Sequence, residues 1–454
     1  MITHPQISFV TLGCAKNEVD TAHMKKQLAA AGFLLAEDPG SADAVVVNTC
    51  SFIQAATEES LEAIFDIAGR ENFAQGQAKL VVAGCMPARY GDELVDELPE
   101  AACFVPCSKE DDIVAVLAGL FPDFAAGAKD LPAQAAQEGS VAPSEGAGAG
   151  VVADAVAAAA ETPLSAYVKI SDGCDRFCSY CTIPYIRGRY HSYPQATIVA
   201  EVEEQRAAGV REIVLIAQDT GRWGADFEQP STLADLMEHL ATAYPETWFR
   251  VMYLQPEGIS DQLLACVARH DNICSYFDIP LQHVDASILR AMNRTGSRKE
   301  FEALLAHIRA CVPGVTLRTT LIAGFPGESE AAFEELCDFI QDADFDYVGV
   351  FPYSCEEGTR AATLPGQIDE ETKLERAQML RDSADSVSVA RIAARIGTQL
   401  DVLVLGFEED GQLYGRAHCQ APDVDGVTYV AQGSPGEIKR VTIVDTLLYE
   451  MEGE

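Results

Sequence analysis

The first 122 residues alternate short apolar runs with longer amphipathic stretches. Apolar runs over 7–12, 44–48 and 79–83 have the length and the valine and isoleucine content of buried strands. Stretches with helical spacing over 18–31 and 55–68 separate them. This alternation predicts an N-terminal α/β domain, in which a parallel sheet is covered by helices.

Residues 163–394 repeat the pattern of strand followed by helix. Strands are expected over 166–170, 212–217, 248–253, 276–280, 316–322 and 347–351. Helices are expected over 198–208, 232–243, 261–269, 299–311 and 330–341, with a long helix over about 370–396. Six such units predict a central partial (β/α)6 barrel with its functional groups at the carboxyl ends of the strands.

The last sixty residues have a different pattern. Short strand-like runs over 399–405, 413–417, 428–430 and 438–445 alternate with turns rich in Gly and Asp. This pattern predicts a small antiparallel β-barrel appended as a recognition module.

Residues 123–162 are rich in Ala and Gly and poor in large apolar side chains, which predicts a flexible linker. The expected domains are therefore 1–122, 163–394 and 395–454, joined by this linker. No segment has the pattern of a membrane span or a signal peptide, so a cytoplasmic protein without membrane partners is expected.

The formal charge of −38 is spread along the whole chain. Residues 395–454 alone hold four basic and eleven acidic residues, a net charge of −7. A nucleic-acid enzyme usually has a basic stripe that neutralises phosphates, and no predicted domain is basic. Either the acidity is general to the organism's soluble proteins, or it favours a basic protein partner.

Three of the fourteen cysteines, Cys174, Cys178 and Cys181, form a CxxxCxxC motif directly after the first predicted barrel strand. Three thiolates on one loop can bind three irons of a 4Fe–4S cluster and leave the fourth iron open. S-adenosylmethionine (SAM) can chelate the open iron, and its reductive cleavage gives a 5′-deoxyadenosyl radical. A zinc site is the alternative. Structural zinc normally has four ligands, however, and the nearest candidate for the fourth, His191, lies ten residues after Cys181.

A second set, Cys14, Cys50 and Cys85, has one cysteine just past each predicted N-terminal strand. Because the carboxyl ends of parallel strands share one edge, these residues could meet there and bind a second cluster. Three unrelated half-buried thiols are the alternative. Cys103 and Cys107 lack a third partner and are interpreted as bystanders.

Three more residues are candidates for cofactor binding. Gln218 ends the second barrel strand, and Gly324 lies in a turn where the backbone could approach a nucleoside closely. A tight turn from strand to helix, without a ligand, is the alternative for Gly324. Arg318, within the fifth strand, could bind the SAM carboxylate or form an internal ion pair.

Arg290, Arg294 and Arg298 repeat every four residues, which predicts one shared helix face. Most such faces are solvated, and contact with the substrate is the alternative. No catalytic residue beyond the cluster ligands is indicated.

A three-cysteine α/β domain, a CxxxCxxC barrel and a small terminal barrel, in this order, resemble the methylthiotransferases. These are radical SAM enzymes with two 4Fe–4S clusters and a C-terminal TRAM domain. The motifs that carry the resemblance are CDRFCSYCTIP at 174–184, PLQH at 280–283, MNR at 292–294 and GFPGE at 324–328. The resemblance implies that Tyr180 packs near the SAM adenine, with packing of the loop as the alternative.

The family has two main branches, of which one modifies adenosine beside the tRNA anticodon. The other adds a methylthio group to the β-carbon of an aspartate in the twelfth small-subunit ribosomal protein. The strings at 217–220, 350–359 and 415–426 resemble the second branch, except at Cys355 and at His418-Cys419. The acidic C-terminal domain also favours a basic ribosomal protein over tRNA, and no direct nucleic-acid binding is expected.

The resemblance implies that two SAM molecules are used in each turnover. One would methylate a sulfur held at the Cys14/Cys50/Cys85 cluster. The other, at the Cys174/Cys178/Cys181 cluster, would give the radical that takes hydrogen from the aspartate. An external low-potential electron donor is required. A tRNA methylthiotransferase and a non-catalytic iron–sulfur electron carrier are the competing hypotheses.

Overall fold

The computed structural model describes residues 4–124 and 163–454, which form two compact units. The first unit holds the described residues of 1–13, 20–50 and 59–162, and the second holds 14–19, 51–58 and 163–454. Nearly all of the predicted linker, residues 125–162, lies outside the described residues. Among the helices that the structure does describe, none is long and apolar enough to cross a membrane.

The first unit contains a five-stranded sheet in the order β2-β1-β3-β4-β5, with every pair parallel. The strands are β1 (Gln6–Thr11), β2 (Leu34–Leu35), β3 (Ala44–Thr49), β4 (Lys79–Gly84) and β5 (Cys103–Pro106). The predicted parallel sheet is confirmed. Sequence reasoning missed the edge strands β2 and β5, because two and four residues are too short for a periodic pattern.

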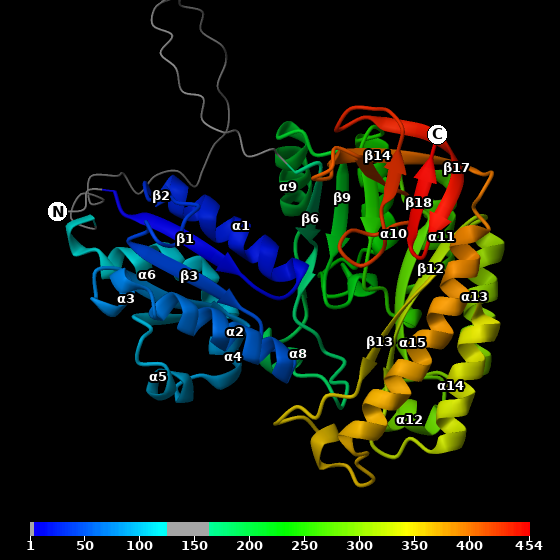
Figure 1. Cartoon of the computed structure of the whole chain (residues 1–454), viewed down its shortest axis with the longest axis horizontal. Helices are drawn as coiled ribbons and strands as arrows, with labels where there is room; N and C mark the ends of the chain where they lie inside the picture. Colours follow the sequence, from blue (N-terminus) through cyan, green and yellow to red (C-terminus); the bar gives the residue numbers. More distant parts are fainter. Residues whose placement is uncertain (1–3, 125–162) are drawn as a thin grey trace, which may run out of the picture. The chain divides into compact units, whose positions relative to one another are not determined.

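Two helical layers cover this sheet (Figure 1). One layer holds parts of α1 (Ala15–Ala30) and α6 (Ile113–Leu120), packed on Val46 and Val81. The other holds parts of α2 (Gln54–Ala68) and α5 (Glu93–Glu97), packed on Val45 and Val82. Neighbouring valines of one strand point to opposite faces, so a continuously apolar strand is buried on both sides.

From residue 163 on, the second unit contains six main strands, and a short antiparallel pair, β7 (Ser171–Asp172) and β8 (His191–Ser192), lies between the first two. The six main strands are β6 (Ser165–Lys169), β9 (Glu212–Ile216), β10 (Trp248–Val251), β11 (Tyr276–Gln282), β12 (Thr316–Ala323) and β13 (Tyr347–Pro352). They form two three-stranded parallel sheets, and a β-bridge between Phe249 and Ile273 links the two. The six predicted strands are therefore present, with an interrupted ladder between the third and the fourth.

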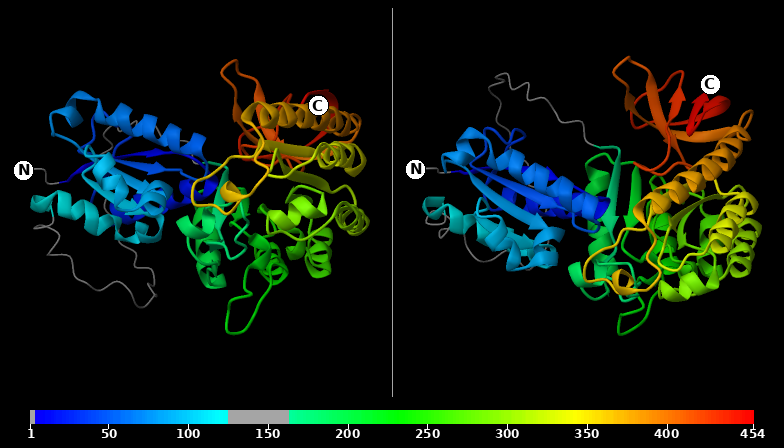
Figure 2. Two further views of the ribbon diagram at one scale, coloured as in Figure 1. Left: turned by 90° about the horizontal axis from the view of Figure 1, so that it is seen from below. Right: turned by 60° about the horizontal axis from the view of Figure 1, so that its bottom comes forward.

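Helices lie on the outer side of these strands (Figure 2). They are α9 (Gln195–Ala207), α10 (Leu233–Ala243), α11 (Asp261–Arg269), α12 (Ala286–Ala291), α13 (Arg298–Cys311) and α14 (Glu330–Ala343). The long helix α15 (Glu370–Ala393) packs against β13 and α14.

The C-terminal region is a closed five-stranded barrel. Its strands are β14 (Gln399–Phe407), β15 (Leu413–Ala417), β16 (Thr428–Val430), β17 (Ile438–Leu447) and β18 (Glu450–Gly453). The predicted barrel is confirmed, but it is mixed rather than wholly antiparallel, because β18 closes it by pairing parallel to β16. The short β18 was missed in the sequence.

Buried charges and a shared apolar core join this barrel to the central strands. Val214 and Trp248 belong to the same core as Val402 of the C-terminal barrel. Glu212, at the start of β9, pairs with Arg250 at 2.9 Å and also with Arg416. Burial alone would raise the pKa of Glu212, but the two arginines lower it to about 2. The carboxylate therefore stays charged between the two elements.

Candidate functional site

The three cysteines of the CxxxCxxC motif lie on a loop that follows the short strand β7 (Ser171–Asp172). Gly173 starts the loop with a φ of +74°, and a Cβ there would lie 2.2 Å from the carbonyl oxygen of Arg189. Only glycine fits this position. The Cys174 amide donates to the carbonyl of Gly188 at 3.2 Å, which fixes the first cysteine beside the same segment.

The far side of the loop is held by residues that follow α12. The Ser179 amide donates to the Met292 carbonyl at 2.9 Å. The Asn293 side chain donates to the carbonyls of Arg176 and Phe177, at 2.9 and 3.1 Å. Asn293 itself has a φ of +59°, a conformation that Asn tolerates better than most residues. The cysteine loop therefore has its shape imposed from both sides.

None of the three thiols is in a disulfide, and each has a hydrogen-bond donor. The backbone amides of Arg176 and Ile183 act on Cys174 and Cys181, and Nη1 of Arg294 lies 3.9 Å from Sγ of Cys178. Burial, together with the nearby Cys178, raises the pKa of Cys181 to about 12. Hydrogen-bond donors that face sulfur stabilise a thiolate ligand. Burial disfavours the charged thiolates, and the positive charge of bound iron would offset that cost. The residues fit an iron–sulfur cluster.

The prediction that Arg290, Arg294 and Arg298 share a helix face is wrong. Arg290 belongs to α12, which ends at Ala291, and Arg298 is the first residue of α13. Arg294 lies in the turn between the helices, because the left-handed conformation of Asn293 ends the first of them. Arginines spaced by four residues fit one helix, but this spacing alone does not show whether a turn interrupts the segment. The contact of Arg294 with Cys178 was therefore missed.

The predicted cofactor residue Gln218 follows β9 at its carboxyl end. Its Oε1 atom is buried and has no hydrogen-bond partner among the described residues. The adjacent Asp219 accepts a hydrogen bond from Nε of Arg176 at 2.6 Å, which connects this strand end to the cysteine loop. An unsatisfied buried acceptor is costly unless a ligand or water completes it, and a ligand at this point fits.

Tyr180 packs against the apolar cluster that contains Met292, Phe325 and Tyr353. Packing of the loop, which the sequence left open as the alternative, is therefore present. Its contact with the SAM adenine stays a prediction.

Gly324 has a φ of +76°, and a Cβ there would lie 2.5 Å from Cγ of Lys373 in α15. Its amide donates to Glu328, whose Oε1 also accepts from Arg376 at 2.8 Å. The buried His283 lies with Nε2 3.2 Å from Oε2 of the same carboxylate. The close approach at Gly324 is thus to a side chain of this protein, and its contact with a nucleoside stays a prediction.

Arg318 is the third residue of β12 and lies toward the amino-terminal ends of the strands. Its Nη1 donates to Asp278 at 2.9 Å, and its Nε lies 3.7 Å from Asp425. The structure therefore contains the internal ion pair that the sequence left open. Binding of the SAM carboxylate by Arg318 stays a prediction.

Cys50 and Cys85 directly follow β3 and β4 in the first unit, and Cys14, which comes three residues after β1, begins a segment of the second unit. These three strands are adjacent and parallel, so the three cysteines follow the same edge of the sheet. Gly84 has a φ of +93°, and a Cβ there would lie 2.2 Å from Oδ1 of Asn48. Glycine is again required immediately before a cysteine.

The bystander pair Cys103 and Cys107 is split by the fold. Cys103 begins β5, and Cys107 directly follows its last residue, Pro106. The two sulfurs therefore belong to opposite ends of one strand and do not form a local CxxxC pair.

The two departures from the family pattern lie in different settings. His418 and Cys419 belong to the contact between the C-terminal barrel and β10, where the His418 ring lies 3.9 Å from that of Trp248. The His418 carbonyl accepts from Arg250 at 2.9 Å. Cys355 is exposed. The His418-Cys419 departure therefore lies in a packed contact inside the protein.

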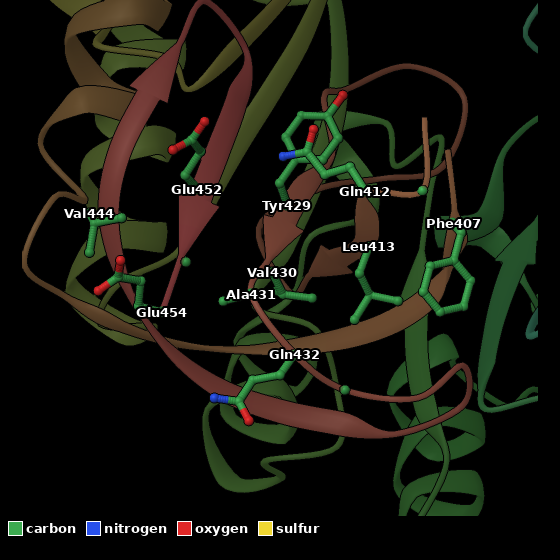
Figure 3. Close-up of a pocket in the computed structure, with 13 residues that line it drawn as sticks. Phe407, Gln412, Leu413, Tyr429, Val430, Ala431, Gln432, Val444, Glu452 and Glu454 are labelled. Atoms are coloured by element: carbon green, nitrogen blue, oxygen red, sulfur yellow. The ribbon is translucent and has the colours of Figure 1, made fainter. Parts of the chain in front are cut away.

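Two hollows adjoin the C-terminal barrel. The first, of about 550 Å³, is lined by residues such as Phe407, Tyr429, Glu452 and Glu454, and none of the six cysteines lines it (Figure 3). The second, of about 630 Å³, lies where this barrel meets β12 and β13. Its lining includes Arg318, Tyr347, Asp423, Asp425 and Glu450. In it, the hydroxyl of Tyr347 and Oδ1 of Asp425 have no hydrogen-bond partner within the described structure.

Comparison with known proteins separates the chain into three matched regions. Residues 6–106 match the model described as uncharacterized protein family UPF0004. Residues 168–340 match the radical SAM superfamily, and residues 396–454 match the TRAM domain.

A solved structure shares part of this arrangement. The radical S-adenosylmethionine methyltransferase TsrM from Kitasatospora setae, with tryptophan and a SAM analogue bound, is similar with a TM-score of 0.52. It is 14% identical, and the match covers 76% of this chain and 72% of that chain. This likeness shows the fold alone.

Curated relatives match over the full length. The chain is 39% identical to the ribosomal protein uS12 methylthiotransferase RimO of Trichlorobacter lovleyi, over 99% of this chain and 98% of that protein. It is 40% identical to the protein of the same name from Pelotomaculum thermopropionicum, over 99% of both.

Fold, cysteine loop and matched regions define a radical SAM methylthiotransferase, an enzyme class that depends on SAM and iron–sulfur chemistry. Within that class, the chain belongs to the family of ribosomal protein uS12 methylthiotransferases named RimO.

Proposed function

We propose that this protein adds a methylthio group to the β-carbon of an aspartate in ribosomal protein uS12, with two 4Fe–4S clusters and two SAM molecules per turnover. The cysteine loop carries the proposal, because three free thiols there each have a hydrogen-bond donor on a loop clamped from two sides. Family membership supports the choice of reaction.

Cys174, Cys178 and Cys181 would hold one cluster, and Cys14, Cys50 and Cys85 the other. When bound, these groups and SAM supply a radical able to take hydrogen from an unactivated carbon, together with a sulfur carrier. The protein's own residues set the frame for that chemistry. Gln218 offers an unused buried acceptor, and the Arg176–Asp219 pair holds the strand end against the loop.

The acidic C-terminal barrel supports a basic protein as the substrate. Asp423 and Glu450 line the hollow beside β12 and β13, and residues 395–454 carry a net charge of −7. Such a surface attracts a basic ribosomal protein and repels a phosphate backbone. This is the observation that favours uS12 over tRNA. A cytoplasmic location and an external low-potential donor belong to the same proposal.

The test is anaerobic reconstitution with iron, sulfide, SAM and a strong reductant, with purified uS12 and bulk tRNA offered in parallel. Mass spectrometry of the digested uS12 should show one SCH₃ group in place of hydrogen on an aspartate. Modified adenosine in the tRNA, with unmodified uS12, would overturn the proposal. Two bound clusters without any 5′-deoxyadenosine release would instead support an electron carrier.

A further inference from the structure

Arg294 is a partly buried arginine without a carboxylate partner. Its Nη2 donates to Oε1 of Gln255 and to the carbonyl of Pro280, both at 2.7 Å. Its Nε is buried and has no hydrogen-bond partner in the described part of the chain. All of these partners are neutral, so a charged guanidinium is held away from solvent by groups that do not compensate its charge.

The acid whose charge also acts on Arg294 is engaged elsewhere. Glu257 pairs with Arg176 at 3.0 Å and accepts from the Thr295 hydroxyl at 2.8 Å. Among the ion pairs formed by residues 4–124 and 163–454, none includes Arg294. The remaining contact of the guanidinium is Sγ of Cys178, 3.9 Å from Nη1.

We infer that Arg294 is a positioning residue that sets the reduction potential of the cluster bound by Cys174, Cys178 and Cys181. This inference rests on the proposed function, because it requires a cluster at these cysteines. A cluster with three thiolates is anionic, and it gains a further negative charge on reduction. A fixed positive charge with an N–H aimed at one thiolate stabilises the reduced form and raises the potential.

The geometry around Arg294 explains why the charge stays in place. Two strong bonds, to Gln255 and to Pro280, fix the plane of the guanidinium before any cluster is present. The preceding residues, Met292 and Asn293, hold the cysteine loop itself. One short turn therefore positions both the ligand loop and the charge beside it.

The experiment uses the full chain with Cys14, Cys50 and Cys85 replaced by Ala, so that only the second cluster forms. Arg294→Gln and Arg294→Lys are compared in this background after anaerobic reconstitution. Iron content is measured first, and the midpoint potential is then measured by a redox titration followed by electron paramagnetic resonance. Arg290→Gln is the matched control, because Arg290 is an exposed arginine one turn earlier, in α12.

Arg294→Gln should shift the midpoint to a more negative potential. Arg294→Lys, which keeps the charge but loses the planar fork, should shift it less, and Arg290→Gln should leave it unchanged. The slowed release of 5′-deoxyadenosine by Arg294→Gln should recover with a stronger reductant. A purely structural role predicts no such recovery.

Full iron content with an unchanged midpoint in both Arg294 variants would overturn the inference while leaving the proposed function intact. If Arg294→Gln binds no iron, Arg294→Met, a second neutral variant, decides, and a wild-type midpoint with full iron content there overturns the inference equally. Failure of the background protein to form any cluster at the triad would instead overturn the proposed function.

Discussion

The two cysteine sets are built in opposite ways. Cys174, Cys178 and Cys181 are neighbours in sequence on one loop, and later segments clamp that loop through Met292 and Asn293. Cys14, Cys50 and Cys85 are far apart in sequence, and the order of three adjacent strands places them after the same sheet edge. The first set lies within one loop that residues distant in sequence support. The second set is brought to one edge of the sheet by the order of the strands.

The two sets therefore place different requirements on the fold. The loop needs its clamps, since eight residues without regular structure cannot hold three sulfurs in place. The strand ends need the register of the sheet, which apolar cores on its two faces support. In both regions a glycine with positive φ comes immediately before a cysteine, as at Gly84 and Gly173.

The largest effect should come from removing one cysteine of each set. Cys178→Ala should reduce the release of 5′-deoxyadenosine to background, because the proposed radical-forming site would lose a ligand. Cys50→Ala should keep that release but give no methylthio product. Chromatography of the nucleoside and mass spectrometry of uS12 measure the two outcomes. If Cys50→Ala abolished SAM cleavage with the triad's iron retained, the two sets would not have separate tasks.

Glu212→Gln should destabilise the second unit by about 3–5 kcal/mol, because Arg250 and Arg416 would lose a buried carboxylate. Hydrogen exchange should then rise in β9 and β10 while β3 and β4 stay protected. Equal loss of protection in both units would show that the two cysteine regions share one cooperative core. Glu302→Gln, which removes a half-exposed pair with Arg298, is the control and should change little.

The effect of Glu212→Gln on stability should depend on pH. The pKa of Glu212 is lowered from 4.5 to about 2, so its stabilising effect is complete above pH 4.5 and is lost as the pH falls toward 2. The difference in unfolding free energy between the wild type and Glu212→Gln should therefore shrink across that window. Urea unfolding at several pH values measures it.

Gly173→Ala and Gly84→Ala should each cost about 1–3 kcal/mol, because both positions have positive φ and no room for a Cβ. Each variant should lose the iron of its own site, about four of about eight atoms. SAM cleavage then distinguishes them, since Gly173→Ala should lose it and Gly84→Ala should keep it. Identical behaviour of the two variants would contradict the separate construction of the two regions.

The smallest effect is expected at Asn293, whose side chain holds the cysteine loop. Asn293→Ala removes two hydrogen bonds to the cysteine loop, worth about 1–2 kcal/mol together. Iron should leave the triad faster when a chelator is added. Asn272→Ala removes comparable bonds to the carbonyls of Ala241, Tyr244 and Thr247, far along the chain from the loop. It should not change the rate of iron loss.

Most of the fold followed from apolar periodicity. Strands such as β3 and β9 contain runs of Val, Ile and Leu, so their positions were predictable. The short strands β2 and β18 were not, because two and four residues are too few to show a periodic pattern. The gap in the ladder between β10 and β11 also depends on tertiary packing.

The site was predictable where it is local. The CxxxCxxC spacing indicated one cluster, and the strand ends of the N-terminal sheet suggested the other. The role of Arg294 was hidden, because its neighbours Gln255 and Pro280 come from other strand ends. The ion pair of Arg318 could only be left open, since its partners Asp278 and Asp425 lie on separate elements.

The core shared by the central strands and the C-terminal barrel has a consequence for how this protein is made. Met451 and Ile443 pack in the same core as Val214 and Trp248. Synthesis proceeds from the amino terminus, so the strands of the C-terminal barrel leave the ribosome after the central strands that they cover. Val214 and Trp248 stay uncovered until the C-terminal barrel has been made, and a chain truncated before β14 would expose both apolar surface and the Glu212–Arg250 pair.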